Sequence, residues 1–196
     1  NYIVLSPGIS LLKNKILSEF KKKIITDIDL FFLINNKFKS IVVTGTNGKS
    51  TTCKLLAHIL KKNKLKYFLG GNIGTPILDL KNCKNSYVII EASSFQLAHS
   101  QFICPDYALF LNLSNDHLDW HGGRSNYLKA KLKIFSLQKK NQYAIINNQI
   151  TIAIQMKDSN TEAVAGYPLF VPGTLDPTVT FNFYDASAGQ MYYNIG

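Results

Sequence analysis

The stretch from Ser40 to Thr52, SIVVTGTNGKSTT, constrains the fold more than any other part of the chain. Its first half is a run of β-branched residues, which indicates a buried strand. A turn with two glycines follows, and the order Gly-Lys-Ser then leads into a helical pattern that ends at about Lys62. A strand, a glycine turn and a helix in this order predict an α/β sheet with an anion-binding turn.

Strand and helix signals alternate over the first 150 residues, which predicts a mostly parallel sheet with flanking helices. Apolar runs predict further strands at residues 2–6, 66–70, 86–91, 107–113 and 142–147, and helical periodicity predicts helices at 10–23 and 125–138. After about residue 150 lysine nearly vanishes and Thr, Ala, Gly and Pro become more frequent. The alternation in TVTFNFYD, residues 178–185, predicts a β-rich C-terminal tail.

The formal net charge is +10, but residues 151–196 carry an acidic excess, so the positive charge lies in residues 1–150. These positive residues are scattered lysines, with Arg124 as the single arginine, so we expect anionic substrates rather than nucleic acid. No apolar run is long enough to span a bilayer, and we expect no membrane insertion. The N-terminus has neither a Met nor a basic region before its apolar stretch, so we expect no secretory signal and a chain that begins within a longer protein. Three cysteines without metal-ligand spacing fit a reduced, cytoplasmic setting.

The glycine turn predicts a phosphate-binding loop, although Val43 stands where the commonest form of that motif has its first glycine. Lys49 would reach the β- and γ-phosphates of ATP, and the Ser50 hydroxyl would bind Mg²⁺. The alternative is an ordinary strand–helix turn with Ser50 or Thr51 near a capping position. The predicted nucleotide-binding residues are Gly45, Thr46, Asn47, Gly48, Lys49, Ser50 and Thr51.

Glu91 ends a predicted strand, in IIEASSFQL, where an acid could face the phosphate loop and supply a second Mg²⁺ ligand. Alternatively, Glu91 simply marks a strand end that meets water. Ser93 and Gln96 follow at the start of a predicted helix, where they suit capping as well as substrate contact.

The segment LNLSNDHLDWHGG carries Asp116, His117, Asp119 and His121. In an extended chain the side chains of His117, Asp119 and His121 would share one face and could bind a metal, whereas an Asp-capped helix start is equally compatible. Lys131 falls on the apolar stripe of the following helix. An inward lysine is costly unless it is paired or chemically altered, and the alternative is that it extends to the surface.

Together these motifs resemble the Mur ligases of peptidoglycan synthesis. GTNGKSTT, GGNIGTP, the Glu91-x-Ser-Ser-Phe-Gln-Leu stretch and NLSNDHLDWHGG followed by KAKLKIF occur in that family's order and approximate spacing. The shortened loop is the form that these ligases use, and folylpolyglutamate synthetase shares it. SSFQL, LSPGI and TDIDLF resemble the members that add D-glutamate. The resemblance covers about residues 2–148.

The resemblance implies a cytoplasmic, monomeric ATP-dependent ligase of cell-wall synthesis that joins D-glutamate to UDP-N-acetylmuramoyl-L-alanine through an acyl phosphate. It implies that Lys49, Glu91, His117 and Lys131 are catalytic. Ser50 and Glu91 would hold one Mg²⁺ and His117 a second, with Lys131 carbamylated to act as a metal ligand. Asn72, Ser93 and Gln96 would contact the sugar-nucleotide substrate or order the site.

The resemblance also predicts the domain organisation. Residues 1–36 would be the end of an N-terminal domain and its linker, and residues 37–150 part of the ATP-binding central domain. Residues 151–196 match no part of the family, and their composition favours a segment joined on. We therefore expect that the chain alone is inactive. The alternatives are a non-catalytic ATP-binding remnant, another Mur ligase with a different amino acid, or a folate-type glutamate ligase.

Overall fold

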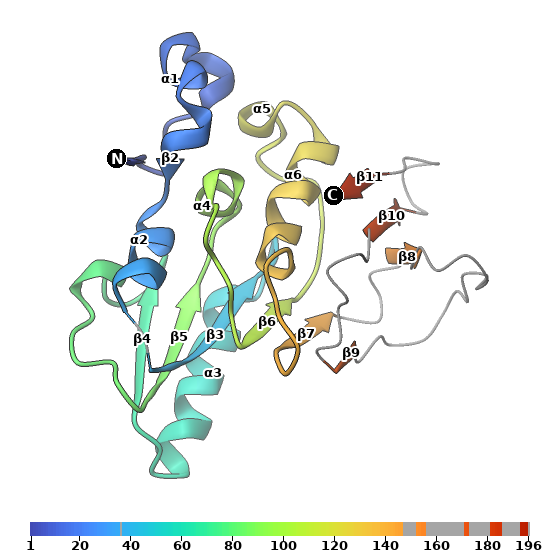
Figure 1. The fold of residues 1–196 in the computed structure, drawn as a ribbon. Helices are drawn as coiled ribbons and strands as arrows, with labels where there is room; N and C mark the ends of the chain where they lie inside the picture. The colour runs from blue at the N-terminus through green and yellow to red at the C-terminus, as the bar shows by residue number, and fades with distance from the viewer. Residues whose placement is uncertain (36, 147–151, 156–170, 173–180, 186–192, 196) are drawn as a thin grey trace.

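The computed structural model describes residues 1–35, 37–146, 152–155, 171–172, 181–185 and 193–195. Its main feature is a six-stranded sheet with the strand order β4-β5-β3-β6-β7-β9 (Figure 1). Five of its strands are parallel: β3 (Lys39–Thr44), β4 (Tyr67–Gly71), β5 (Tyr87–Glu91), β6 (Tyr107–Phe110) and β7 (Tyr143–Ile146). The last, β9 (Val171–Pro172), pairs antiparallel with β7. The predicted mostly parallel α/β sheet is confirmed.

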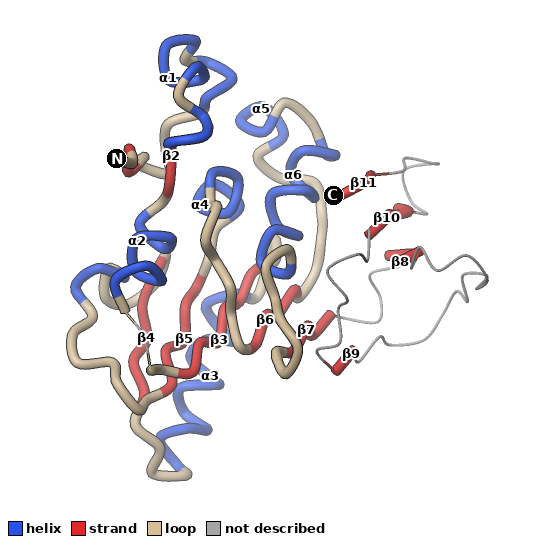
Figure 2. The backbone as a smooth tube through the Cα atoms, viewed as in Figure 1, coloured by secondary structure: helices blue, strands red, loops and turns tan. Residues whose placement is uncertain are grey.

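Helices cover both faces of this sheet (Figure 2). They are α2 (Asp27–Ile34), α4 (Ser94–His99) and α6 (Arg124–Leu132) on one face and α3 (Lys49–Lys62) on the other. The short helix α5 (Leu118–His121) lies beyond the strand ends next to α6, and η3 (Ile77–Asp79) and η4 (Lys133–Phe135) are short 3₁₀ turns. The predicted helix at 125–138 is therefore α6 continued by η4.

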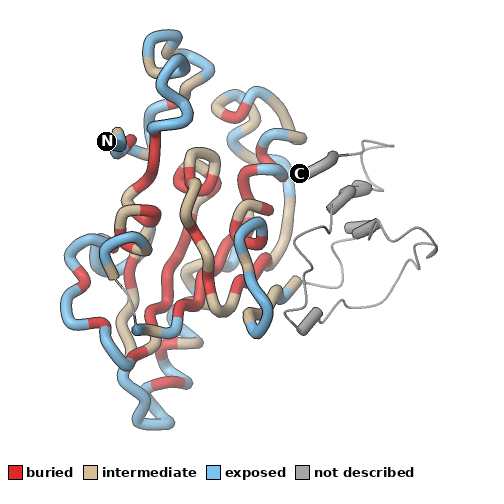
Figure 3. Tube along the Cα trace, in the orientation of Figure 1, coloured by how far each residue is buried: buried red, intermediate tan, exposed pale blue. Residues whose placement is uncertain are grey.

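Successive side chains in the strands point to opposite faces, so the apolar strands feed two separate cores. Val42, Ile90 and Phe110 pack with residues of α2, α4 and α6 on one face. Ile41, Ile89 and their neighbours pack with α3 on the other face. The central strands β3, β5 and β6 are correspondingly almost fully buried, whereas the flanking strands β4 and β7 are mostly half-buried (Figure 3). Burial of each fully buried aliphatic side chain contributes roughly 1.5–3 kcal/mol to the free energy of unfolding.

The connections bring three loops to the same edge of the sheet. The chain passes from β3 through α3 to β4 and then returns to β5, which lies between them. It next crosses β3 to form β6 on the other side. In register, Glu91 lies beside Val43, and Phe110 lies beside Thr44. The loops after β3, β5 and β6 therefore meet where the strand order changes direction, which is where open α/β sheets bind ligands.

The N-terminal segment differs from the prediction of one helix over residues 10–23. It forms η1 (Leu11–Lys13), α1 (Lys15–Glu19) and η2 (Lys21–Lys23), between two short parallel strands, β1 (Ile3–Val4) and β2 (Ile24–Ile25). The Asn14 side chain accepts a hydrogen bond from the Leu17 N–H and starts a new helix within the predicted one. The expected apolar stripe is not buried, since Leu12 is 65% and Ile16 is 74% exposed.

Beyond residue 150, β8 (Ile152–Gln155), β10 (Phe181–Asp185) and β11 (Tyr193–Ile195) form an antiparallel sheet. These strands agree with the β-rich tail that the sequence predicts. The predicted domain boundary at residue 150 and most of the remaining tail lie outside the described residues. Among the helices of the described ranges, none is long and apolar enough to cross a membrane.

Candidate active site

The loop between β3 and α3 contains two glycines that its geometry requires. Gly48 precedes α3 with φ +80°, in the left-handed region that favours glycine. A Cβ at Gly45 would lie 3.0 Å from the Leu111 Cβ, because the loop passes close to the segment after β6. The backbone N–H groups at the start of α3 have no partners earlier in the helix, so they can bind an anion.

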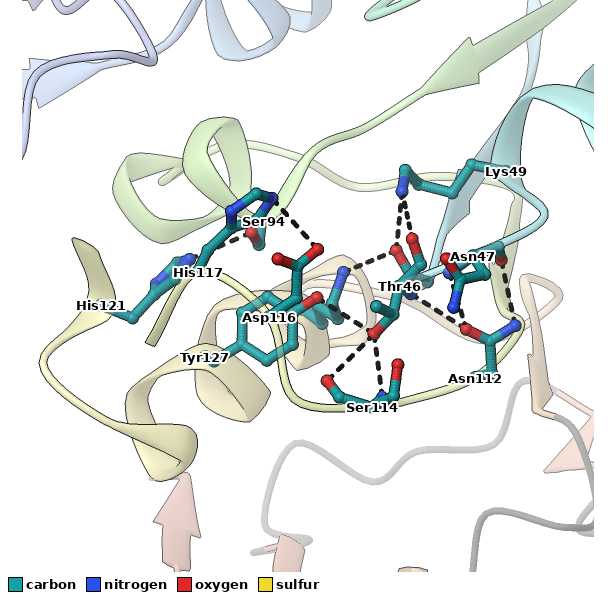
Figure 4. A network of polar contacts seen from close by, with 12 residues as sticks. Thr46, Asn47, Lys49, Ser94, Asn112, Ser114, Asp116, His117, His121 and Tyr127 are labelled. Atoms are coloured by element: carbon teal, nitrogen blue, oxygen red, sulfur yellow. Dashed lines mark hydrogen bonds and ion pairs between the residues drawn. The ribbon is translucent and has the colours of Figure 1, made fainter. Parts of the chain in front are cut away.

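Asn112 fixes the shape of this loop from the neighbouring strand connection. Its Oδ1 accepts hydrogen bonds from the backbone N–H groups of Thr46 (3.1 Å) and Asn47 (2.9 Å), and its Nδ2 donates to the Asn47 carbonyl (3.0 Å) (Figure 4). In the sequence Asn112 falls within the strand predicted at residues 107–113, and no role was predicted for it. An amide side chain just after a buried strand was the only signal in the sequence for this role. The hydrogen bonds of Asn112 to Thr46 and Asn47 could not be predicted from it, because they join two loops that are far apart in sequence.

A hydroxyl cluster supports the same loop. Thr46 Oγ1 pairs with the Tyr127 hydroxyl at 3.0 Å and accepts a hydrogen bond from the Ser114 backbone N–H, also at 3.0 Å. Asn112 and Tyr127 thus join the loop to β6 and α6.

The Lys49 side chain, which was predicted to bind the β- and γ-phosphates, folds back over the phosphate loop. Its Nζ donates to the carbonyls of Gly45 (3.0 Å) and Thr46 (2.8 Å). The ammonium group is thus held beside the backbone turn rather than extended into solvent. Thr51, which was also predicted to bind nucleotide, is exposed in the first turn of α3.

Ser50 and Glu91 meet at the edge of the sheet, as the prediction requires. Ser50 Oγ donates to Glu91 Oε2 at 2.8 Å, and Asn72 Nδ2 donates to Glu91 Oε1 at 3.0 Å. Glu91 is only 2% exposed and forms no ion pair with any described residue. A buried carboxylate without a cation is costly, so this group of oxygens fits a hard divalent cation such as Mg²⁺.

Ser93 and Gln96 form a capping box at the start of α4. The Gln96 N–H donates to Ser93 Oγ, and Gln96 Oε1 accepts from the Ser93 N–H. The capping role that the sequence allowed for both residues is therefore present.

Helix α5 begins at Leu118, so the extended arrangement of His117, Asp119 and His121 that the sequence allowed is wrong. The alternative of an Asp-capped helix start is also wrong, because His117 takes the capping position and makes no side-chain capping hydrogen bond. His117 precedes α5 with φ +52°, and His121 lies at its end. His117 Nε2 lies 3.2 Å from an Asp116 oxygen, and its ring contacts Phe95 with centroids 4.6 Å apart. No group of three or more His, Cys, Asp or Glu side chains in the part of the chain that the structure describes could hold a metal.

His121 is buried and pairs with Ser94 Oγ at 3.0 Å. Burial, together with the smaller effect of the positive charge of Lys131, lowers its pKa to about 4. His121 is therefore a neutral side chain at pH 7, and it supports α5 against α4.

Lys131 points inward, as its place on the apolar stripe predicts, and is 1% exposed. Its Nζ donates to the Gly45 carbonyl at 2.7 Å and lies 4.6 Å from the centre of the Tyr127 ring. Burial lowers its pKa to about 7, helped by the positive charge of Lys49. A substantial fraction of this amine is therefore neutral, and so nucleophilic, at neutral pH.

The structure thus brings together part of the predicted site. Hydrogen bonds join Ser50, next to the phosphate loop, to Glu91, and Glu91 to Asn72. Lys131 contacts the loop at the Gly45 carbonyl. Neither His117 nor Lys131 is hydrogen-bonded to Ser50 or Glu91. One edge of the sheet therefore combines an anion-binding turn with a buried carboxylate, an arrangement suited to a nucleotide phosphate with its metal.

Comparison with known families agrees with this geometry. The family described as Mur ligase middle domain matches residues 43–169. The chain belongs to the Mur ligase family. The match extends beyond residue 148, so the predicted limit of the resemblance was too short.

Two curated relatives are UDP-N-acetylmuramoylalanine–D-glutamate ligases. The protein of Rickettsia bellii is 48% identical over 147 residues, which is 74% of this chain and 32% of the relative. That of Rickettsia conorii is 37% identical over 203 residues, covering 98% of this chain and 40% of the relative. The latter alignment includes most of the tail, against the expectation of a segment joined on.

A solved UDP-N-acetylmuramate:L-alanyl-γ-D-glutamyl-meso-diaminopimelate ligase from Neisseria meningitides has a similar fold, with a TM-score of 0.50 and 17% identity. The alignment covers 74% of this chain and 50% of that one. The chain spans about a third of the length of the first curated relatives.

Proposed function

We propose that this Mur ligase chain binds ATP and contributes to joining D-glutamate to UDP-N-acetylmuramoyl-L-alanine. The relatives that share 48% identity with it carry the name of that ligase. The observation that supports the proposal is the Ser50–Glu91 hydrogen bond beside the phosphate loop, because this hydroxyl and this carboxylate would together be able to bind Mg²⁺.

In this proposal the substrate carboxylate attacks the γ-phosphorus of ATP, giving an acyl phosphate and ADP. The amine of D-glutamate then attacks the acyl carbon, and phosphate leaves. Lys49 and the loop N–H groups would bind the β- and γ-phosphates and stabilise the charge that develops on their oxygens. Asn72 holds Glu91 in place, while Ser93 remains a proposed substrate contact. Gln96 would order the site, since its side chain is hydrogen-bonded within the protein.

Ser50 and Glu91 would hold Mg²⁺, which neutralises phosphate charge when it is bound. His117 is proposed as a ligand of a second Mg²⁺. In its ammonium form Lys131 has no lone pair for a metal, and we propose that carbamylation turns it into an anionic ligand of that ion. Its neutral amine would add to the carbon of CO₂ and release one proton, leaving an anionic carbamate. The support is its burial and its lowered pKa.

A non-catalytic ATP-binding protein is the second candidate, since the phosphate loop and the Ser50–Glu91 pair would bind ATP and its metal without any ligation. The deciding experiment is an assay of amide formation in the presence of ATP and Mg²⁺, in which mass spectrometry detects the product. It is run on the chain and on a chimaera in which residues 1–146 replace the matching part of the Rickettsia bellii ligase.

Product from UDP-N-acetylmuramoyl-L-alanine and D-glutamate in the chimaera supports the proposed specificity. Product with a folate substrate alone would overturn it. ATP binding by an inactive chimaera would favour the non-catalytic candidate.

A further inference from the structure

Helix α2 holds helix α4 at both ends through two carboxylates of its first turn. Asp27 accepts both hydrogen bonds of Gln96 Nε2, at 3.1 and 3.0 Å, in the first turn of α4. Asp29 is fully buried and accepts from the Ser100 hydroxyl and from the backbone N–H groups of Gln101 and Phe102, just after α4 ends. These contacts join TDIDLF, in the segment predicted to be a linker, to the helix that follows Glu91.

Gln96 is occupied on both sides of its amide. While Nε2 donates to Asp27, Oε1 accepts from the Ser93 N–H and the Ser93 hydroxyl, both at 3.1 Å. Gln96 is 3% exposed, so no water replaces these bonds easily. The acceptor at position 27 thereby fixes which way the amide points, and the amide oxygen in turn holds the Ser93 hydroxyl.

The first turn of α4 contacts the histidines of α5. Ser94 Oγ pairs with His121, and the Phe95 ring lies 4.6 Å from the His117 ring and 4.8 Å from the Trp120 ring, between centroids. A displacement of this turn would therefore move the side chains against which His117 rests.

We propose that Asp27 is a positioning residue of the active site. Acting through Gln96, it sets the orientation of Ser93 and of the α4 turn on which His117 rests. The importance of Asp27 to catalysis rests on the proposed function of Ser93 and His117. The coupling of Asp27 to Ser93 through Gln96 does not depend on that function.

The pairing chemistry allows a rescue experiment. Gln96→Glu places a carboxylate against Asp27, so the two groups repel and the link breaks. Adding Asp27→Asn supplies an amide that can donate to one oxygen of the new carboxylate, while the other oxygen still accepts from Ser93. The double variant therefore restores the link with donor and acceptor exchanged.

The experiment measures hydrogen exchange at the Ser93 N–H, which donates to Gln96 directly, and the emission of Trp120, the only tryptophan in the chain. We expect Gln96→Glu to speed exchange about tenfold and to shift the emission, for a loss of roughly one hydrogen bond. The double variant should return both signals to within about twofold of the original protein.

Asp27→Ala provides a second variant if Gln96→Glu does not fold, because Asp27 is only partly buried. It should also speed exchange at Ser93. Asp106→Asn is the matched control, since Asp106 accepts from Ser40 near the opposite end of the strands and should change stability without changing Ser93 exchange.

Unchanged Ser93 exchange in Asp27→Ala, or a folded double variant that behaves like Gln96→Glu, would overturn the proposal. Neither readout needs ATP or ligation. A failed ligase assay would therefore count against the proposed function and leave this coupling standing.

Discussion

Glu91 and Lys131 are both buried charged residues, yet they have different surroundings. Glu91 has two neutral hydrogen-bond donors and no cation, whereas Lys131 has one carbonyl acceptor and an aromatic ring. The sequence left an exposed alternative open for each residue, a strand end that meets water for Glu91 and extension to the surface for Lys131, and the structure shows both side chains buried. The carboxylate is suited to a metal without modification, whereas the proposed metal role of Lys131 depends on its carbamylation.

Replacing Glu91 tests the metal pair. Glu91→Gln keeps the shape but removes the charge, so we expect ATP affinity in the presence of Mg²⁺ to fall by about tenfold or more. Affinity without Mg²⁺ should change much less. The measurement is calorimetric titration, with Glu19→Gln on the exposed side of α1 as the control. Equal loss with and without Mg²⁺ would contradict the metal role.

Carbamylation of Lys131 can be observed without activity. With ¹³C-labelled bicarbonate, the chain should give a carbamate carbon resonance that grows as pH rises through about 7, because the pKa of Lys131 is lowered to that value. Lys131→Ala should remove the resonance, whereas Lys129→Ala on the same helix should retain it. A spectrum identical in the two variants would argue against the modification.

His121 makes stability depend on pH. Its pKa is about 4 when folded and 6.5 in its ordinary state, so below pH 6.5 the unfolded chain binds the proton more readily. Stability should therefore fall by about 1–2 kcal/mol from this residue between pH 7 and pH 5.

Thermal unfolding across that range measures the effect. His121→Gln should reduce the pH dependence, and His58→Gln on the exposed face of α3 should leave it unchanged. If His121→Gln unfolds with the original pH dependence, the burial argument fails.

At the scale of elements, the phosphate loop is shaped by its neighbours as much as by its own glycines. Asn112, after β6, satisfies two N–H groups of the loop between β3 and α3. The loop therefore has its form before any phosphate arrives, which lowers the entropic cost of binding.

Asn112→Ala should lower stability by about 1–3 kcal/mol, since three side-chain hydrogen bonds are lost. It should also weaken ATP binding by about tenfold, because the loop must then be ordered on binding. Denaturant unfolding and nucleotide titration report the two effects. Asn115→Ala, at an exposed position in the same connection, is the control. A variant as stable and as tight-binding as Asn115→Ala would show that Asn112 does not shape the loop.

The elements show what sequence patterns can predict. Continuous apolar runs such as SIVVTG predicted the strands correctly, because both faces of a parallel sheet are buried. The helix predicted at residues 10–23 failed because the Asn14 side chain caps a helix within it, which apolar spacing does not reveal. Contacts such as Asn112 with the loop, or Asp27 with Gln96, depend on the tertiary arrangement and have no local signal.

At the scale of the whole molecule, the described residues include the proposed nucleotide site, and the chain spans about a third of the length of its relatives. The phosphate loop, Ser50 and Glu91 all lie within residues 45–91, so ATP binding should need only this sheet. Amide formation also requires a site for the attacking amine, so ATP binding is expected to be measurable independently of ligation.

Calorimetric titration of residues 1–196 with ATP, with and without Mg²⁺, tests whether the loop and the Ser50–Glu91 pair form a nucleotide site. We predict saturable binding that Mg²⁺ strengthens and that Lys49→Ala weakens by about tenfold or more. Lys54→Ala, one turn along the same helix and exposed, should bind like the original chain. Absence of binding, or binding that neither Mg²⁺ nor Lys49→Ala alters, would contradict the assignment of this edge of the sheet.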